Sequence, residues 1–186
     1  MSTDYRLTDS ANPEETLSDV LTYAELLTTP QLARLYVYVL RNGPVAIERV
    51  KEDLDVPHST TYKYVGELEE MGILTRQEDE TPTRISVEPI HLTVDTDHDE
   101  VVATPMLVDA IGRQYDDEDI RVFVERQGIP KLAAALHYTL RVRAGGMTQR
   151  TAANKLDVHP VEGTTVITAL QDVLEDATAY DPYVEP

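Results

Sequence analysis

The chain has 186 residues, no Cys and no Trp, and its 34 acidic against 16 basic side chains give a net charge of −18. The length suits one compact domain or two small ones. Without Cys, a disulfide framework, a cysteine nucleophile and a thiolate metal site are excluded. No apolar run approaches the ~18 residues that a membrane helix needs, and residues 1–8 lack the pattern of a signal peptide. We therefore expect a soluble, cytoplasmic protein.

The acidic charge is the unusual feature of the composition. It exceeds the magnitude of ~2–8 that suits a small soluble domain. One explanation is an acidic mimic of a partner, or a protein that avoids nucleic acid; the other is adaptation to molar salt, which screens self-repulsion. Lys is scarce, Arg is three times commoner and the acids are spread along the chain, which favours adaptation to salt. The pattern resembles that of proteins from halophilic archaea.

Taken in order, the first elements are helical. A flexible N-terminus over residues 1–12 precedes them. Apolar residues at helical spacing predict helices over 13–27, 30–42, 46–54 and 57–71. Thr29 is placed to cap the second helix, whose first residue is Pro30. The period then changes, and we predict strands over 73–76 and 84–87 and a second hairpin from 90–94 and 100–103.

The rest of the chain again predicts helices. They run over residues 105–114, 117–127, 130–144, 148–156 and 160–176, with glycines between several of them. The prediction is a mainly α fold with small β-hairpins, divided into a winged helix-turn-helix domain (13–89), a hairpin connector (90–104), a helical domain (105–177) and a frayed tail (178–186).

The first motif is a tight turn between two helices. In Leu54-Asp55-Val56-Pro57, one apolar residue ends a helix and another fills the turn. Small polar side chains then open the next helix. This is the pattern of a helix-turn-helix, in which the first helix supports the second and the N-terminal end of the second faces a DNA major groove.

The stretch Leu68-Glu69-Glu70-Met71-Gly72-Ile73-Leu74 follows. Here the chain resembles the winged helix-turn-helix regulators of the broad TrmB-like and ArsR-like kind, over about residues 15–90. The resemblance implies a DNA-reading helix with Ser59, Thr60, Tyr62 and Lys63 on its outer face, Tyr64 at its flank and His58 near phosphate. No acid occurs between Pro57 and Gly66. Hydroxyls and a Lys suit phosphates and base edges.

The predicted wing departs from the family pattern. Its tip, over residues 77–83, carries three acids where a phosphate-gripping wing offers Arg or Lys. Arg76 and Arg84 flank the base of the hairpin. They can reach the DNA backbone or pair across the strands with those acids, and the sequence does not choose.

A second motif repeats the first. Leu156-Asp157-Val158-His159-Pro160 nearly repeats residues 54–58, and Thr-Thr follows in both places. It lies in the positive segment 138–171, whose net charge is +2. A second helix-turn-helix with backbone contacts from Arg141, Arg143, Arg150 and Lys155 is one interpretation. Val161 and Gly163 supply no base-reading group, which slightly favours a helical pair used for dimerisation or packing.

The sequence contains no pattern of an enzyme. Residues 95–100 imitate a calcium loop but place Glu100 where glycine is needed, and no phosphate loop or nucleophile elbow occurs. We expect no catalytic residue, metal or cofactor. An effector pocket lined by Leu107, Ile111, Phe123, Leu132 and Leu136 is less favoured than a core. The prediction is a sequence-specific, homodimeric DNA-binding transcription regulator; the alternative is a winged-helix protein–protein module.

Overall fold

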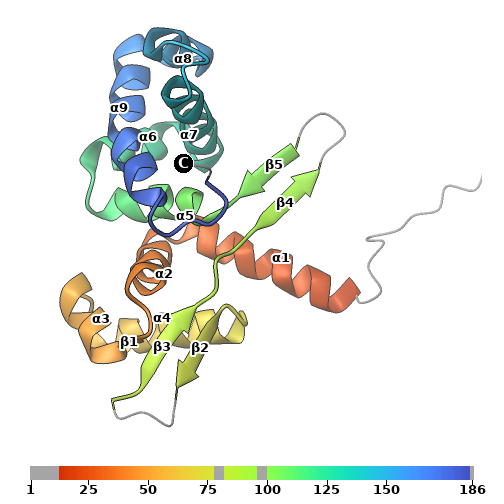
Figure 1. Cartoon of the computed structure of the whole chain (residues 1–186), viewed down its shortest axis with the longest axis vertical. Coiled ribbons are helices and arrows are strands. Elements are labelled where there is room, and N and C mark those ends of the chain that lie inside the picture. Colours follow the sequence, from red (N-terminus) through yellow and green to blue (C-terminus); the bar gives the residue numbers. More distant parts are fainter. Residues whose placement is uncertain (1–12, 78–81, 96–99, 185–186) are drawn as a thin grey trace, which may run out of the picture.

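The computed structural model describes residues 13–77, 82–95 and 100–184. The N-terminal elements are α1 (Pro13–Thr28), α2 (Pro30–Asn42), β1 (Val45–Ala46), α3 (Ile47–Leu54), α4 (His58–Glu70), β2 (Leu74–Gln77), β3 (Arg84–Val87), β4 (Leu92–Asp95) and β5 (Glu100–Ala103). The C-terminal elements are α5 (Pro105–Gly112), the 3-10 turn η1 (Arg113–Tyr115), α6 (Glu118–Gln127), α7 (Ile129–Arg143), α8 (Gln149–Lys155) and α9 (Pro160–Ala177). Two groups of elements occupy the two ends of the long axis, with α2 and α5 between them (Figure 1). None of the described helices is long and apolar enough to cross a membrane.

The lower group in Figure 1 combines α3 and α4 with a small antiparallel sheet of order β1-β3-β2. In its register, Val45 pairs with Ile85 and Leu74 pairs with Val87. The order helix, strand, two helices and hairpin is compatible with a winged helix. The sequence predicts a helix from about Ala46 and contains no local signal for strand β1. In the structure the backbone of Ala46 is extended because it pairs with Arg84 across the sheet.

Helix α2 belongs to both halves of the molecule. One side of α2 buries Leu35 and Tyr36, and the hydroxyl of Tyr36 bonds the backbone after β3, donating to the Glu88 carbonyl at 2.9 Å. Its other side packs against α5 so closely that a Cβ on Gly112 would lie 2.9 Å from the backbone nitrogen of Arg34. The buried apolar residues form one continuous core across both halves.

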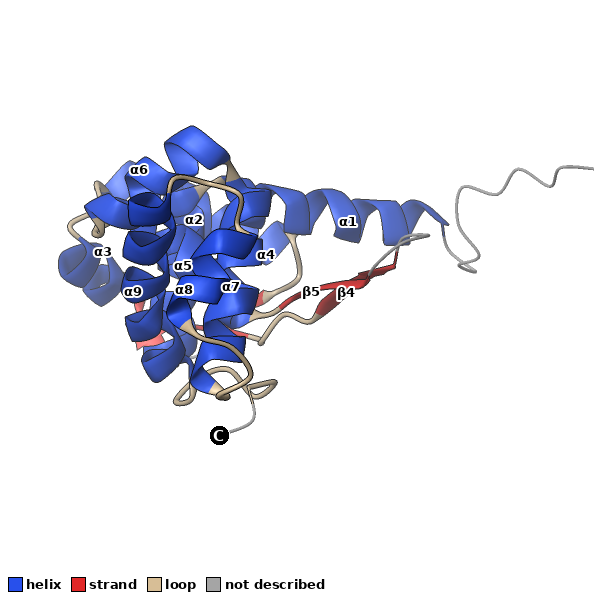
Figure 2. Cartoon of the chain, turned by 90° about the horizontal axis from the view of Figure 1, so that it is seen from above, coloured by secondary structure: helices blue, strands red, loops and turns tan. Residues whose placement is uncertain are grey.

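Helix α1 and the hairpin β4–β5 project from the body on the same side in both views (Figures 1 and 2). We call this pair the arm. Three of its apolar side chains are exposed: Val20 at 47%, Leu21 at 64% and Val102 at 40%. The arm therefore presents apolar surface to solvent within this single chain.

Several local predictions differ from the structure. Thr29 stands at the N-cap of α2, but its side chain makes no capping hydrogen bond. The helix predicted over 105–114 ends at Gly112 and continues as a 3-10 turn. The tail is not frayed up to residue 184, because Asp181 is only 3% exposed and its carboxylate accepts from the Met106 amide at 2.8 Å. Residues 1–12 and the loop tips at 78–81 and 96–99, on which other predictions fell, lie outside the described residues.

Candidate nucleic-acid interface

The turn between α3 and α4 is built by three residues. Asp55 ends α3 in the left-handed conformation, with φ of 50°, which Asp tolerates better than most residues. The amide of Val56 then donates to the Lys51 carbonyl at 3.1 Å. The Leu54 and Val56 side chains are buried, at 7% and 8% exposure. Burial of both apolar groups fixes the angle at which α4 leaves the turn.

The inner face of α4 is defined by burial. Thr61, Val65 and Leu68 are all fully buried. The Thr61 hydroxyl donates to the Pro57 carbonyl at 3.2 Å, so this buried polar group is satisfied. Since these residues recur every three or four positions, they share one side of the helix, and Ser59, Tyr62 and Lys63 are exposed on the other. The N-terminal turns of α4 therefore offer a fixed outer surface.

The outer face of α4 gathers most of the predicted DNA contacts. His58, Ser59, Tyr62 and Lys63 are exposed and Thr60 is half-buried. The His58 and Tyr62 rings stack, with centroids 4.4 Å apart. These side chains offer hydroxyl donors, a cation and an aromatic surface, which suit phosphates, base edges and thymine methyls.

Glu48 of α3 reaches this face and was not foreseen from the sequence. The Tyr62 hydroxyl donates to Glu48 Oε1 at 3.3 Å. Desolvation and then the Glu48 charge raise the pKa of Tyr62. Tyr62 therefore remains a protonated donor at neutral pH. No local sequence signal marks Glu48, because the contact joins residues fourteen positions apart.

Lys63 and Tyr64 divide between two sides of α4. The Lys63 ammonium lies 3.3 Å from Glu67 one turn later and 5.6 Å from the Tyr64 ring centroid. An exposed i,i+4 pair of this kind contributes only about 0.3–0.5 kcal/mol, so Lys63 can exchange Glu67 for a phosphate. Tyr64 instead turns toward α2, where its hydroxyl bonds Gln31 at 3.1 Å. Tyr64 is thus at the flank, as predicted.

The two arginines at the hairpin base have partners elsewhere. The Arg76 guanidinium lies 2.8 Å from the Glu69 carboxylate of α4, while the acids with which it was predicted to pair across the strands lie outside the described residues. Arg84 donates to the Pro44 carbonyl at 3.4 Å. Both contacts tie the sheet to neighbouring elements.

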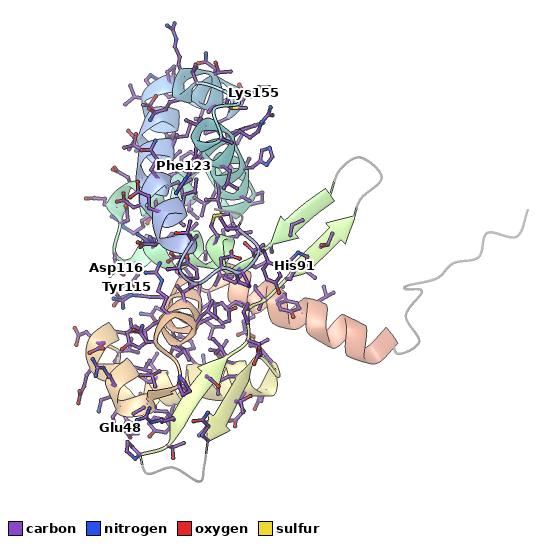
Figure 3. All side chains as sticks on the ribbon, viewed as in Figure 1. Glu48, His91, Tyr115, Asp116, Phe123 and Lys155 are labelled. Atoms are coloured by element: carbon purple, nitrogen blue, oxygen red, sulfur yellow. The ribbon has the colours of Figure 1, made fainter. Side chains whose placement is uncertain are left out.

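Arg34 is a second residue that sequence reasoning missed. From α2 it donates to the Leu54 carbonyl at 2.8 Å, at the helix-turn-helix turn. The same guanidinium holds both oxygens of Asp116, at 2.9 and 3.1 Å, and lies over the Tyr115 ring. Figure 3 places Tyr115 and Asp116 at the level of α2, between the two groups. Arg34 therefore links the turn directly to the C-terminal half.

A cluster of charged side chains makes a further link between the halves. Asp109 of α5 is 6% exposed, and its carboxylate lies 2.7 Å from Arg41 of α2 and 3.2 Å from Arg113. Both arginines also reach Asp176 of α9. The Tyr180 hydroxyl donates to Asp109 at 2.6 Å. We call these five residues the Asp109 cluster.

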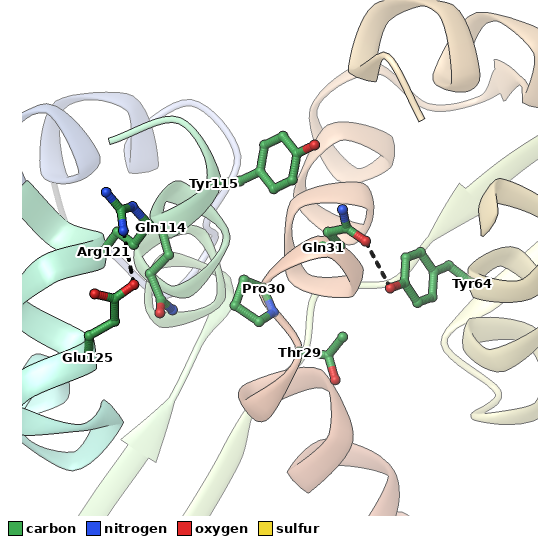
Figure 4. A pocket seen from close by; sticks show the side chains of 8 residues that line it. All are labelled: Thr29, Pro30, Gln31, Tyr64, Gln114, Tyr115, Arg121 and Glu125. Carbon is green, nitrogen blue, oxygen red and sulfur yellow. Dashed lines mark hydrogen bonds and ion pairs between the residues drawn. The ribbon is translucent and has the colours of Figure 1, made fainter. Parts of the chain in front are cut away.

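The predicted pocket residues are core. Leu107, Ile111, Phe123, Leu132 and Leu136 are all buried, at 7% exposure or less. A surface hollow of about 410 Å³ lies elsewhere, between α2, α4, η1 and α6 (Figure 4). Its polar side chains largely satisfy one another, since Tyr64 bonds Gln31 and Arg121 bonds Glu125. We assign no ligand to this hollow.

Four further predicted contacts lie far from α4. Arg141 and Arg143 end α7, and Arg150 and Lys155 belong to α8. All four are exposed. They lie in the upper group of Figure 1, where Figure 3 labels Lys155. The structure thus separates the predicted contacts into two surfaces at opposite ends of the long axis.

The mainly helical fold with its small antiparallel sheets is compatible with a winged helix followed by a helical domain. Comparison with known families agrees, since residues 27–91 match the model of the sugar-specific transcriptional regulator TrmB. Residues 114–179 match a family of unknown function (DUF7437). No curated protein and no solved structure gives a significant match. The first match covers α2 to β3, the segment that holds the turn and α4.

Proposed function

We propose that this chain is a sequence-specific DNA-binding transcription regulator that acts as a dimer in a high-salt cytoplasm. The observation that carries the proposal is the outer face of α4. In a strongly acidic chain, this face holds Ser59, Tyr62 and Lys63 with no acid of its own. The acids Glu67, Glu69 and Glu70 lie on the C-terminal half of the helix, away from the groove that its N-terminal end would enter.

The binding test is fluorescence anisotropy with duplexes from the promoter region of the protein's own gene, in molar KCl. Tyr62→Ala/Lys63→Ala removes an aromatic ring and a cation from the outer face. Tyr183→Ala/Arg121→Ala removes the same two groups from the other half, where both are exposed and Arg121 has acidic partners as Lys63 does. We expect the first variant to weaken binding by about 10- to 100-fold, from the loss of contacts of about 1–3 kcal/mol, and the control to bind as the parent.

The salt dependence of binding is a second test. Counterion release makes the affinity of a basic protein for DNA fall steeply with salt. A chain of charge −18 must rely on hydroxyl contacts, shape and cation uptake between its acids and the phosphates. We expect a flatter dependence on KCl than a basic helix-turn-helix protein gives, or a reversed one. A steep loss of affinity as KCl rises contradicts this expectation.

The arm is our proposed dimer surface, together with the C-terminal helices. Two-fold DNA sites are read by two-fold proteins, and Val20 and Leu21 expose apolar surface on α1. Leu21→Asp in the arm should convert a dimer to a monomer in light scattering at molar KCl. Val161→Asp, at a similarly exposed apolar residue on α9, makes the same test of the C-terminal helices.

A protein–protein module is the second candidate function. It is favoured by the acids that hold Tyr62, Lys63 and Arg76. If no duplex binds and the chain is folded and dimeric, either its operator lies outside its own promoter region or the outer face of α4 recognises a protein, and a pull-down from the native extract distinguishes the two.

A further inference from the structure

Two three-helix segments of this chain share the same turn. We call α2–α4 the first unit and α7–α9 the second unit. In the second unit Asp157 has φ of 52°, against 50° for Asp55 in the first, and these are the two non-glycine residues with positive φ in the described chain. The left-handed residue thus falls at the same place in the repeated Leu-Asp-Val sequence.

The buried residues on both sides of the turn also repeat. Each residue of the first unit and its counterpart in the second are separated by the same number of positions in the sequence. Leu54 and Leu156 before the turn are both buried. On the helix after it, Val65 matches Ile167 and Leu68 matches Leu170, and all four are fully buried. The same face of α9 therefore packs inward as in α4.

A cation from the preceding helix holds the turn in each unit. Arg34 donates to the Leu54 carbonyl and Lys131 donates to the Leu156 carbonyl, both at 2.8 Å. Each bond satisfies an orphan carbonyl at the end of a short helix. Turn, burial and cation agree, so the second unit has helix-turn-helix geometry and is more than a pair of packed helices.

The second unit also carries unpaired positive charge. Among the described residues, the side chains of Arg141, Arg143, Arg150 and Lys155 have no acidic partner. Most other described cations are held by acids, as Arg49 is by Asp53 and Arg121 is by Glu125. In a chain with 34 acids, four exposed cations without acidic partners on the consecutive helices α7 and α8 are suited to binding an external polyanion.

The start of α9 is free of outward-facing acid charge. Glu162 is the one acid between Val158 and Gln171. Its carboxylate is 16% exposed, and it accepts from Gln127 and lies 4.0 Å from Arg126. The outer face then holds Val161, Thr164 and Thr168, all exposed. Helix α9 thus begins with hydroxyl side chains and ends with acids, as α4 does.

We infer that the second unit is a second DNA-binding surface, which contacts the phosphates of duplex DNA through Arg141, Arg143, Arg150 and Lys155 with the start of α9 against the duplex. This assigns DNA binding to the segment that matches the family of unknown function. Because α4 and α8 lie toward opposite ends of the long axis (Figure 1), the second surface contacts a different stretch of DNA from the one that α4 reads. Val161 and the threonines lack bidentate groups, so its binding depends little on sequence.

The test uses the full-length chain carrying Tyr62→Ala/Lys63→Ala, so that the outer face of α4 is impaired. The probe is a labelled 40-base-pair duplex of mixed sequence. Binding is followed by anisotropy between 0.5 and 2 M KCl. Two further pairs of changes are made in this background, Arg141→Gln/Arg143→Gln and Arg150→Gln/Lys155→Gln. Each pair should weaken binding about threefold or more at the lowest salt and shift the slope of log affinity against log salt by about 2, as loss of two phosphate contacts requires.

The control pair, Arg49→Gln/Arg121→Gln, removes the same charge at two exposed arginines that have acidic partners. It should leave the affinity and the slope near those of the background. If the control weakens binding as much as the test pairs, or if the test pairs bind as the background does, the second surface is excluded. Circular dichroism melts check folding, and removal of exposed unpaired cations should leave the melting temperature unchanged.

The inference stands apart from the proposed role of α4. If α4 does not read DNA, Tyr62→Ala/Lys63→Ala leaves promoter binding unchanged and the arginine pairs still reduce it. If the second surface is wrong, promoter binding depends on α4 alone and the arginine pairs have no effect.

Discussion

The first and second units have the same turn in different surroundings. In the first, Thr61 is fully buried on the inner face of α4, and the sheet β1-β3-β2 lies beside the helices. In the second, Gly163 takes the place of Thr61 and a Cβ there would lie 3.1 Å from Ala153, so α9 approaches α8 closely. The local sequence therefore specifies the turn, while outward side chains and neighbouring elements determine what each unit can bind.

The largest expected effect comes from the matched core leucines. Leu68→Ala and Leu170→Ala each remove a fully buried side chain and should cost about 2–5 kcal/mol in the free energy of unfolding. Urea denaturation at fixed KCl measures both. Because the core is continuous, each variant should unfold in one transition, and two separate transitions would show that the units fold independently.

The Asp109 cluster tests the connection between the units. Asp109→Asn leaves Arg41 and Arg113 with Asp176 as their remaining acid. Breaking a buried ion pair costs about 3–5 kcal/mol, and we expect about 3 because Asp176 still compensates. Thermal melts measure the loss. Asp116→Asn, whose side chain is 59% exposed, is the matched control and should cost less than about 1 kcal/mol.

The contact between Gly163 and Ala153 tests the difference between the two units. Gly163→Thr places in α9 the residue that α4 has at the matching position. The added Cβ meets the Ala153 backbone, and overpacking of this kind costs about 1–3 kcal/mol. Urea denaturation of Gly163→Thr measures this loss of stability. Thr164→Val, at an exposed neighbouring residue, is the control. If the threonine is tolerated, the close helix approach is not required.

The turn cations give a smaller effect that differs between the units. Arg34→Met loses the bond to Leu54 and both bonds to Asp116, whereas Lys131→Met loses one bond to Leu156. Hydrogen bonds from charged groups contribute about 1.5–3 kcal/mol. We expect the free energy of unfolding to fall by an amount near the upper end of this range for Arg34→Met and near the lower end for Lys131→Met. Equal losses would mean that the Asp116 bonds contribute nothing.

The smallest effect is a dependence on pH. Burial raises the pKa of Asp176, but the hydrogen bond to Arg113 and the charges of Arg41 and Arg113 outweigh it, and the pKa falls below 3.8. The folded state therefore releases this proton more readily than the unfolded state, so the stabilisation is complete above pH 3.8 and is lost as the pH falls below it. Melts across that range should show a steeper decline for the parent than for Asp176→Asn.

The helices of both units and the two turns were predictable from the sequence. Apolar spacing and the repeated Leu-Asp-Val sequence depend on neighbours a few residues apart, so local preference is sufficient. It also placed Ser59, Thr60, Tyr62 and Lys63 on one helix face, because helical periodicity fixes which side chains share a side.

The long-range pairings depend on the folded arrangement of the elements. Val45–Ala46 became a strand because β3 lies beside it, and Arg76 turned to Glu69 of α4. Asp181 and Tyr180 packed the tail against α5. Each of these contacts joins groups that no short pattern relates. Desolvation and charge pairing select such partners only after the core has brought them together.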